Sequence, residues 1–343
     1  MRETLVLVHG VQPQPFVKPH DADYEALLKG IARYLPEDSP WHNAKPIYIE
    51  WGKRHPTPPT PPFPPTAPTA PGTPDTHRNH HALSPAQQHY GTATLSRLKR
   101  TDRFSLNPAR WGLNGLRSLF VFGFGDMFYY VSKDGKASLR TELASRIVQA
   151  LAPQLTPERD PDPLSLTFLG HSAGSVICAD FLFSLFFEDR PAEDFLGPPK
   201  ETDDPEYQAL CGQLERLQRM ARGGRLRVRR LITFGSPFAL VLPRNRQLVE
   251  DLADCEPLNP AHYGLKDSPA DRPSSPFDHS PLTGPRWINI WDRDDPIAYP
   301  IAQLFNDHPC AQDLYLRVSP WVSKAHQAYW NSGKVHKHIA RLW

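Results

Sequence analysis

Three side chains that could together cleave an acyl bond follow separate apolar runs of the sequence. Ser172 lies in a Gly-His-Ser-Ala-Gly motif at 170–174, directly after the apolar run 164–169. Asp295 and His326 come later, each just past another predicted strand. A serine hydroxyl becomes a useful nucleophile when a histidine takes its proton, and a carboxylate holds that histidine in the required tautomer. The three residues therefore predict a nucleophilic site with the chain order Ser, Asp, His.

The neighbours of Ser172 predict a sharp turn from a strand into a helix. The run 164–169 is typical of a buried strand, and the apolar residues 175–182 continue as a helix. A serine on such a turn has its hydroxyl clear of the sheet, and the glycines two positions before and after it avoid clashes across the turn. The alternative is a glycine-rich turn whose serine has no chemical role.

The carboxylate has competing candidates. Asp292, Asp294 and Asp295 all follow the predicted strand 287–291. Asp295, which directly precedes Pro296, and Asp294 are the two leading candidates. Only one of them can face the imidazole.

Among the fifteen histidines, His326 follows the last predicted strand by several residues, as the base of such a site must. We expect His9 and His171 to be structural neighbours of the site. We expect His336 and His338 to be solvated on the terminal helix.

The elements that position these residues alternate along the chain. Apolar runs predict strands at 4–8, 47–51, 164–169, 231–234, 287–291 and 314–318. Helical spacing predicts helices at 21–35, 138–151 and 205–222, besides the one after Ser172. This order favours an α/β fold with a mostly parallel sheet and helices on both faces, where functional residues collect at the carboxyl ends of the strands.

Composition excludes several classes of function. The net charge of the 343 residues is +2, which gives no general attraction for nucleic acid. The arginine-rich stretch 216–230 is interpreted as a solvated helix face and strand entry. Four scattered cysteines and the absence of a basic-then-apolar leader predict a cytoplasmic protein with reduced thiols. We expect no metal, because His77, His80, His81 and His89 lack accompanying Cys or carboxylate ligands, and no cofactor.

Two segments interrupt the pattern. Prolines dominate about 55–75, and because proline lacks an N–H and fixes φ, this segment is expected to form a surface insertion. The aromatic segment at about 104–131 is too short and too interrupted by charge to cross a membrane. It either packs in the core or forms a lid over the site, and we expect part of it to cover the pocket.

Five motifs in the same order resemble the α/β-hydrolase superfamily, specifically its serine esterase and lipase branch. They are His9-Gly10, residues 170–174, Phe234-Gly235-Ser236-Pro237, Asp294-Asp295-Pro296-Ile297 and His326-Gln327-Ala328-Tyr329-Trp330. The resemblance covers essentially the whole chain outside the proline-rich insertion. The chain departs from the family's pattern in two ways. It starts directly at the first catalytic-loop strand, so we expect no antiparallel strands at the edge of the sheet. It also has low-complexity loops instead of a compact cap.

The resemblance implies a role for each matching residue. Ser172 would be the nucleophile, His326 the base and then the acid, and Asp295 the orienting carboxylate. We favour Asp295 because its place before Pro296 fits the family's usage, and Asp294 is the alternative. The backbone N–H groups of Val11 and Ala173 would form the oxyanion hole. No substrate-binding residue is assigned.

The expected protein is a single α/β-hydrolase domain, 1–343, that hydrolyses carboxylic esters through an acyl-enzyme. Aromatic residues near the pocket, Trp291, Tyr329 and Trp330 among them, suggest a small-molecule ester with an apolar acyl or aryl group. No transmembrane segment is expected, and transient contact with a lipid interface is compatible with the sequence. The alternatives are an acyltransferase or thioesterase with the same triad, or a catalytically silent scaffold.

Overall fold

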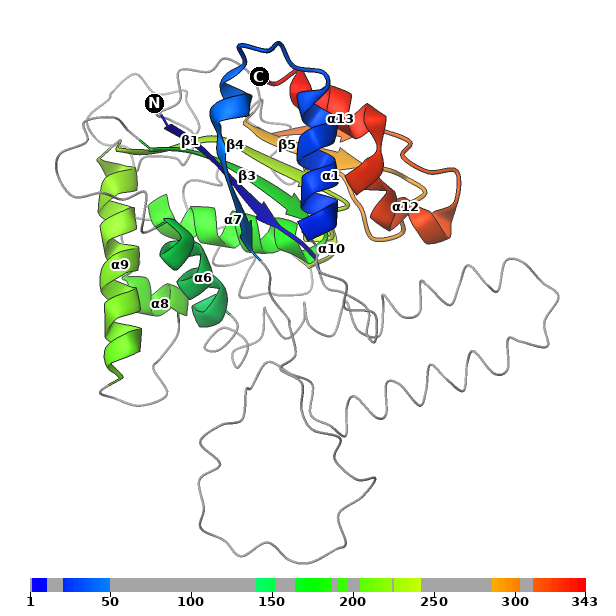
Figure 1. The fold of residues 1–343 in the computed structure, drawn as a ribbon. Coiled ribbons are helices and arrows are strands. Elements are labelled where there is room, and N and C mark those ends of the chain that lie inside the picture. Colours follow the sequence, from blue (N-terminus) through cyan, green and yellow to red (C-terminus); the bar gives the residue numbers. More distant parts are fainter. Residues whose placement is uncertain are drawn as a thin grey trace, which may run out of the picture.

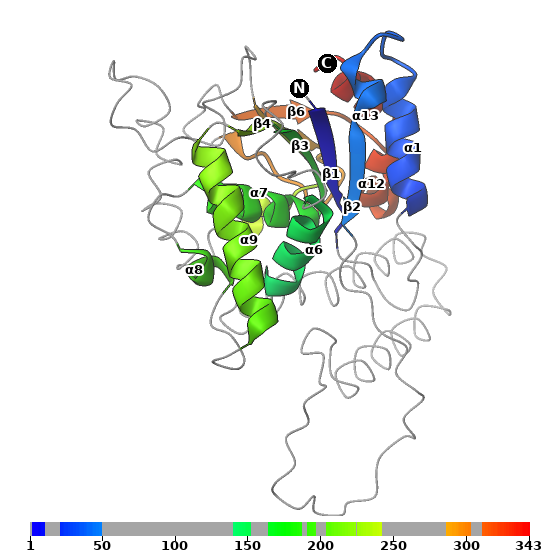
Figure 2. The same ribbon diagram turned by 60° about the vertical axis from the view of Figure 1, so that its left-hand side comes forward.

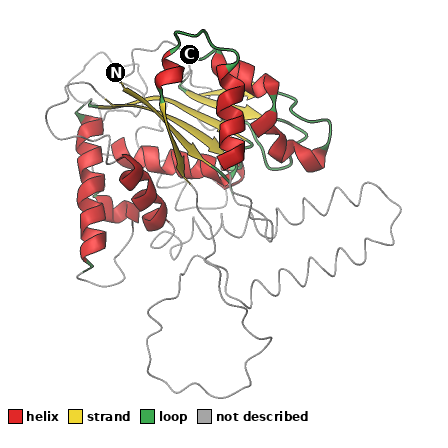
Figure 3. Ribbon diagram, viewed as in Figure 1, coloured by secondary structure: helices red, strands yellow, loops and turns green. Residues whose placement is uncertain are grey.

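The computed structural model describes residues 2–10, 21–49, 140–151, 164–186, 191–196, 204–223, 225–241, 286–302 and 311–343. The proline-rich insertion and the predicted lid lie outside these residues. The described chain forms an α/β fold in which a six-stranded sheet lies between two layers of helices (Figures 1 and 3).

All neighbouring strands of the sheet are parallel. The strands are β1 (Arg2–Val8), β2 (Lys45–Ile49), β3 (Leu164–His171), β4 (Leu226–Phe234), β5 (Trp287–Trp291) and β6 (Ala311–Tyr315). Their order across the sheet is β2-β1-β3-β4-β5-β6. The predicted parallel α/β architecture is therefore confirmed.

Helices cover both faces of the sheet (Figure 2). One layer contains α6 (Thr141–Leu151), α7 (Ala173–Phe186), α8 (Ala192–Leu196) and α9 (Pro205–Arg222). The other contains α1 (Asp21–Ala32), η1 (Pro40–Asn43), η9 (Tyr329–Asn331) and α13 (Gly333–Ala340). The remaining helices are α10 (Phe238–Val241) and α12 (Val322–Ala328). None of the helices in these described ranges is long and apolar enough to cross a membrane.

Alternate residues of the central strands enter two separate cores. In β1, Val6 and Val8 pack with the α6–α9 layer, whereas Leu5 and Leu7 pack with α1 and α13. Because a parallel strand is buried on both faces, its sequence is a continuous apolar run. This explains why the strands could be predicted from the sequence.

The last strand differs from its prediction at 314–318, because β6 spans Ala311–Tyr315. The polar Asp313 lies within the strand, where its carboxylate accepts N–H groups from Ile301, Ala302 and the Asn289 side chain. Asp313 is half-buried, and polar groups whose hydrogen bonds are satisfied are tolerated in a sheet. Residues 316–319 instead leave the strand.

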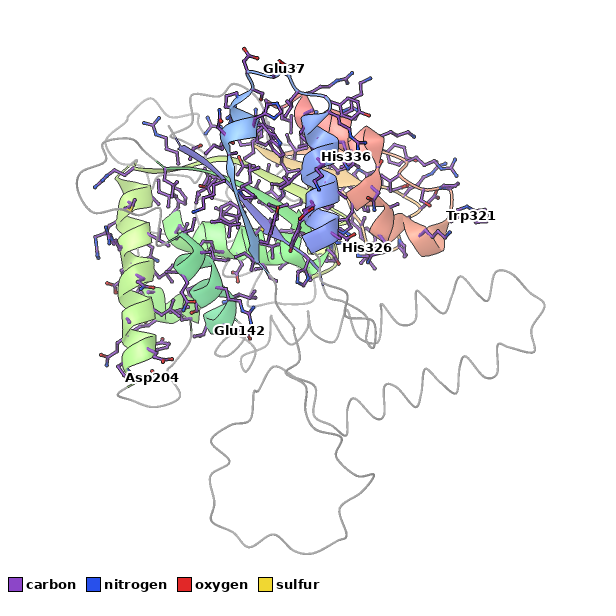
Figure 4. All side chains as sticks on the ribbon, viewed as in Figure 1. Glu37, Glu142, Asp204, Trp321, His326 and His336 are labelled. Carbon is purple, nitrogen blue, oxygen red and sulfur yellow. The ribbon has the colours of Figure 1, made fainter. Side chains whose placement is uncertain are left out.

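The prediction that His336 is solvated is wrong. The side chain is buried between α13 and α1, where a Cβ atom on Gly30 would lie 2.1 Å from its Nδ1 atom. Its Nε2–H donates to the carbonyl of Trp330 at 2.8 Å. Burial lowers the pKa of His336, so the neutral ring is favoured. Figure 4 shows His336 beside α1 and His326 nearer the edge at which the strands end.

The arginine-rich stretch 216–230 is also not uniformly solvated, because Arg230 is only 7 % exposed. The pairing of β3 with β4 shifts by one residue between Leu166 and Thr167, so Leu166 pairs with Val228 and Thr167 with Arg230. Arg229 is thus the extra residue of a β-bulge, and such a bulge changes the direction of the side chains that follow it. Arg230 is thereby placed on the sheet face that Ile232 and Phe234 also occupy.

The turn into α7 depends on Gly174. A Cβ atom on this glycine would lie 2.2 Å from the carbonyl oxygen of Val8 and 2.6 Å from that of His9. We expect Gly174→Ala to lower the free energy of unfolding by about 2 kcal/mol, because the backbone of β1 must move to make room. The measurement is a thermal or denaturant melt.

Gly212→Ala is the matched control. A Cβ atom there has no neighbour within 4 Å, and alanine is the better helix former in the middle of α9. We expect this control to be as stable as the wild type or more stable by about 0.5–1 kcal/mol. A Gly174→Ala variant as stable as the wild type would contradict the tight approach of the two segments.

Candidate active site

The sheet order brings the turn after β1 against the turn after β3. The chain leaves β1 toward α1 on one face and leaves β3 toward α7 on the other. Adjacent parallel strands whose connections diverge in this way open a crevice at their carboxyl ends, and ligands of open α/β sheets bind there. At this point lie Gly10, two residues past the end of β1, and Ser172, directly after the end of β3.

Ser172 alone joins β3 to α7, since β3 ends at His171 and α7 begins at Ala173. Its φ of +54° is the only positive φ among the described non-glycine residues. A side chain in this region strains the backbone by about 1–3 kcal/mol, and such strain concentrates at functional sites. The strand, the turn and the helix agree with the sequence prediction for residues 164–182.

Hydrogen bonds to β4 and α7 fix the strained turn. The Ser172 N–H donates to the carbonyl of Phe234 at 3.1 Å. The Ser175 hydroxyl donates to the carbonyl of Ser172 and lies 2.7 Å from the Ser236 hydroxyl. The sequence predicted no role for either serine. Its only signal is that Ser175 directly follows the motif at 170–174 and that Ser236 lies within the motif Phe234-Gly235-Ser236-Pro237.

Gly10 lies against the Ser172 side chain. A Cβ atom on Gly10 would lie 2.3 Å from Cβ and 2.8 Å from Oγ of Ser172, so only glycine fits this approach. His9, expected to be a structural neighbour, is buried and its Nδ1 donates to the Gly10 carbonyl. Of the two backbone groups proposed for an oxyanion hole, Ala173 is the first residue of α7, where N–H groups have no partner within the helix. Val11 lies outside the described residues.

His326 and Asp295 are hydrogen-bonded to each other in a buried environment. His326 Nδ1 lies 2.9 Å from Asp295 Oδ2, and the two residues are 6 % and 2 % exposed. The other oxygen of Asp295 accepts the N–H of Ile297 at 3.2 Å. Because a carboxylate only accepts, the proton of a neutral His326 lies on Nδ1 and its Nε2 is left to accept another.

Gly235 and His171, which lie next to the Ser172 turn, also lie against the His326–Asp295 pair. A Cβ atom on Gly235, the residue after β4, would lie 3.2 Å from His326 Cε1 and 3.3 Å from Asp295 Oδ2. His171 Nε2 donates to the carbonyl of His326 at 2.7 Å, and the two imidazole centroids are 4.7 Å apart. Ser172, His326 and Asp295 therefore share one edge of the sheet.

No hydrogen bond joins the Ser172 hydroxyl to His326 in the described part of the chain. Such bonds are commonly long in a free enzyme and shorten when substrate binds.

The three aspartates after β5 occupy different environments. Asp295 contacts His326, whereas Asp294 pairs with Arg317 at 3.1 Å on the partly exposed surface. Asp292 is fully buried and accepts the N–H groups of Asp294, Val318 and Ser319. Asp292 thus holds the segment after β6 in place, and Asp295 is the one that faces the imidazole.

Tyr329 and Trp330, expected near an apolar pocket, are fully buried in the core behind His326 and expose no surface to a ligand. The Tyr329 hydroxyl accepts the N–H of Asp292 at 3.0 Å and lies within interaction range of Asp295. Burial raises the pKa of the Tyr329 hydroxyl most, and the negative charge of Asp295 raises it further. The hydrogen bond joins residues 37 positions apart, and no local pattern in the sequence predicts it.

The arrangement can present a hydroxyl, a base and a helix N-terminus to one reacting group. Within the ranges that the structure describes, no three His, Cys, Asp or Glu side chains are grouped to hold a metal ion. The four histidines at 77–89 lie outside those ranges. No protein-family model matches the chain, and no curated protein and no solved structure matches it.

Proposed function

We propose that the chain is a serine hydrolase of the α/β-hydrolase fold that cleaves carboxylic esters. One observation carries the proposal: a serine with a positive φ, between a parallel strand and a helix, lies beside a buried His–Asp pair. Strained serines at strand-to-helix turns are typical of nucleophiles in this fold. The six parallel strands are compatible with it.

In the proposed reaction, the Ser172 oxygen attacks the ester carbonyl carbon while His326 Nε2 takes the hydroxyl proton. The imidazolium is stabilised through its Nδ1–H by Asp295. The carbonyl oxygen becomes negative and accepts the N–H of Ala173, where the positive end of the α7 dipole also favours charge. His326 then donates its proton to the leaving alcohol, which leaves an acyl group on Ser172.

Water completes the cycle in the same way. His326 takes a proton from the water as its oxygen attacks the acyl-enzyme, and Ser172 leaves with that proton as the carboxylic acid is released. A thioester would react by the same steps with a thiol as the leaving group. An alcohol or amine in place of water would give acyl transfer.

A panel of nitrophenyl esters with increasing acyl length tests the proposal. We expect hydrolysis of at least the shorter esters, with the release of one nitrophenol and one carboxylic acid per ester. Added alcohol or amine would divert the acyl group if the chain is a transferase, and product analysis separates the two outcomes. Turnover indistinguishable from that of buffer alone for every ester would contradict ester hydrolysis.

A further inference from the structure

Four buried N–H donors gather around Trp343, at the end of the sheet where the strands begin. They are Nε of Arg229, Nε and Nη1 of Arg230, and Nε1 of Trp343, and none of them has a hydrogen-bond partner among the residues that the structure describes. Figure 1 marks both ends of the described chain on this side, whereas the strands point away from it. The cluster is therefore separated by the length of the strands from Ser172 and His326.

The bulge in β4 creates this cluster. Arg229 has no pairing partner on β3, and Arg230 resumes the register opposite Thr167. Consecutive arginines, which would lie on opposite faces of a regular strand, therefore both reach Trp343. Each guanidinium carbon lies 5.5 Å from the Trp343 ring centroid. The ring of Trp41 packs edge-on against the same indole, and the two ring centroids are 4.6 Å apart.

The local charges do not balance. Glu3 is the carboxylate that pairs with this cluster, and one of its oxygens binds Arg229 while the other accepts the hydroxyl of Thr167. Within the described ranges, Arg230 has no acceptor for its Nε and Nη1 groups. Burial, followed by the charges of Arg229 and Arg286, lowers the pKa of Arg230 to about 10, while Glu3 acts in the opposite direction. Arg230 is therefore still a cation at neutral pH.

Unpaired donors of this kind are costly, because they lose their water without gaining an acceptor. Buried polar groups without partners are rare in native proteins, and an ion or another bound group is one established reason for them. Carboxylate and phosphate oxygens only accept hydrogen bonds, and they are the usual partners of guanidinium groups.

We propose that Arg229, Arg230 and Trp343 form a binding site for a small oxyanion, a phosphate or a carboxylate group. All of its donors are buried, so the group that enters must be small. This site is independent of the proposed ester hydrolysis, and neither proposal requires the other.

Calorimetric titration of the full chain with inorganic phosphate, and separately with acetate, tests the site. Chloride keeps the ionic strength constant. We expect one of the two anions to bind with a stoichiometry of one, and the comparison tells which oxyanion the site prefers. Arg230→Met should weaken that binding by at least about tenfold, since hydrogen bonds to a charged group are lost.

Arg219→Met is the matched control, because it removes the same charge from an exposed position of α9. It should leave the anion affinity unchanged. Trp343→Phe keeps an aromatic ring against the two guanidinium groups and removes only the N–H, so it should also weaken binding, by less than Arg230→Met does.

The melting temperature in buffer without either anion supplies the second readout. There Arg230→Met should be at least as stable as the wild type, because an apolar side chain of similar length replaces an unpaired buried cation. The site is refuted if the wild type binds neither anion or if Arg230→Met binds with wild-type affinity. A much lower melting temperature for Arg230→Met would also refute it, since Arg230 would then make a stabilising contact without any ligand.

Discussion

Replacing Ser172 by alanine is expected to lower kcat for ester hydrolysis by about 10⁴-fold or more, because no acyl-enzyme can form without its oxygen. The fold should be retained. The hydrogen bonds that fix the turn use the backbone N–H and carbonyl of Ser172, which alanine keeps. We expect the free energy of unfolding to change by less than about 0.5 kcal/mol. Nitrophenol release and a thermal melt of the same preparation measure both effects.

Ser184→Ala provides the matched control. Ser184 is a buried serine of α7 whose hydroxyl donates to the carbonyl of Phe181, within the same helix. Turnover by this variant should equal that of the wild type. If Ser172→Ala retained turnover of the same order as Ser184→Ala, Ser172 would not be the nucleophile.

Replacing Asp295 by asparagine is expected to lower kcat by about 10⁴-fold, because the amide favours the wrong tautomer of His326 and cannot stabilise its positive charge. Asp294→Asn makes the same chemical change one residue away. It removes a partly exposed ion pair with Arg317, and such pairs contribute at most about 1 kcal/mol to stability. Its kcat should stay close to the wild-type value.

Two outcomes of the comparison between Asp295→Asn and Asp294→Asn would contradict the proposed roles. A large loss with Asp294→Asn and a small one with Asp295→Asn would assign the carboxylate role to Asp294. Small losses with both would leave His326 without an acid and refute the proposed mechanism. Thermal melts of both variants separate a catalytic effect from unfolding.

The sheet could be predicted from the sequence because its central strands are buried on both faces. Leu5, Val6, Leu7 and Val8 are all nearly inaccessible to solvent, so no polar residue interrupts the run. Where a strand contains a polar residue, the sequence places its bounds wrongly, as it does for β6. Asp313 lies in β6 because it binds Ile301, Ala302 and Asn289, and no local pattern announces these partners.

The site could be predicted in part for a similar reason. The carboxyl ends of parallel strands share one edge, so residues that follow separate strands meet there. The sequence favoured Asp295 but left Asp294 as an alternative, because the choice depends on how the turn after β5 folds. The two environments differ through contacts made by Arg317 and His326, far along the chain.

The surroundings of His336 and Arg230 could not be predicted. His336 is buried because Gly30, in a helix about three hundred residues earlier in the sequence, leaves room for its ring. Arg230 turns inward because of the one-residue bulge in β4. Both features depend on tertiary packing, whereas charge and helical position alone favour solvated side chains.

Labelling of the folded protein with a fluorophosphonate tests the central claim most directly. An activated serine oxygen attacks the phosphorus and displaces fluoride, which leaves a stable adduct whose position mass spectrometry of the digested protein identifies. The account predicts one adduct, on Ser172, in the folded wild type, and almost none in Asp295→Asn or in heat-unfolded wild type. A folded wild type that stays unlabelled, or that carries the adduct on a different residue, would contradict it.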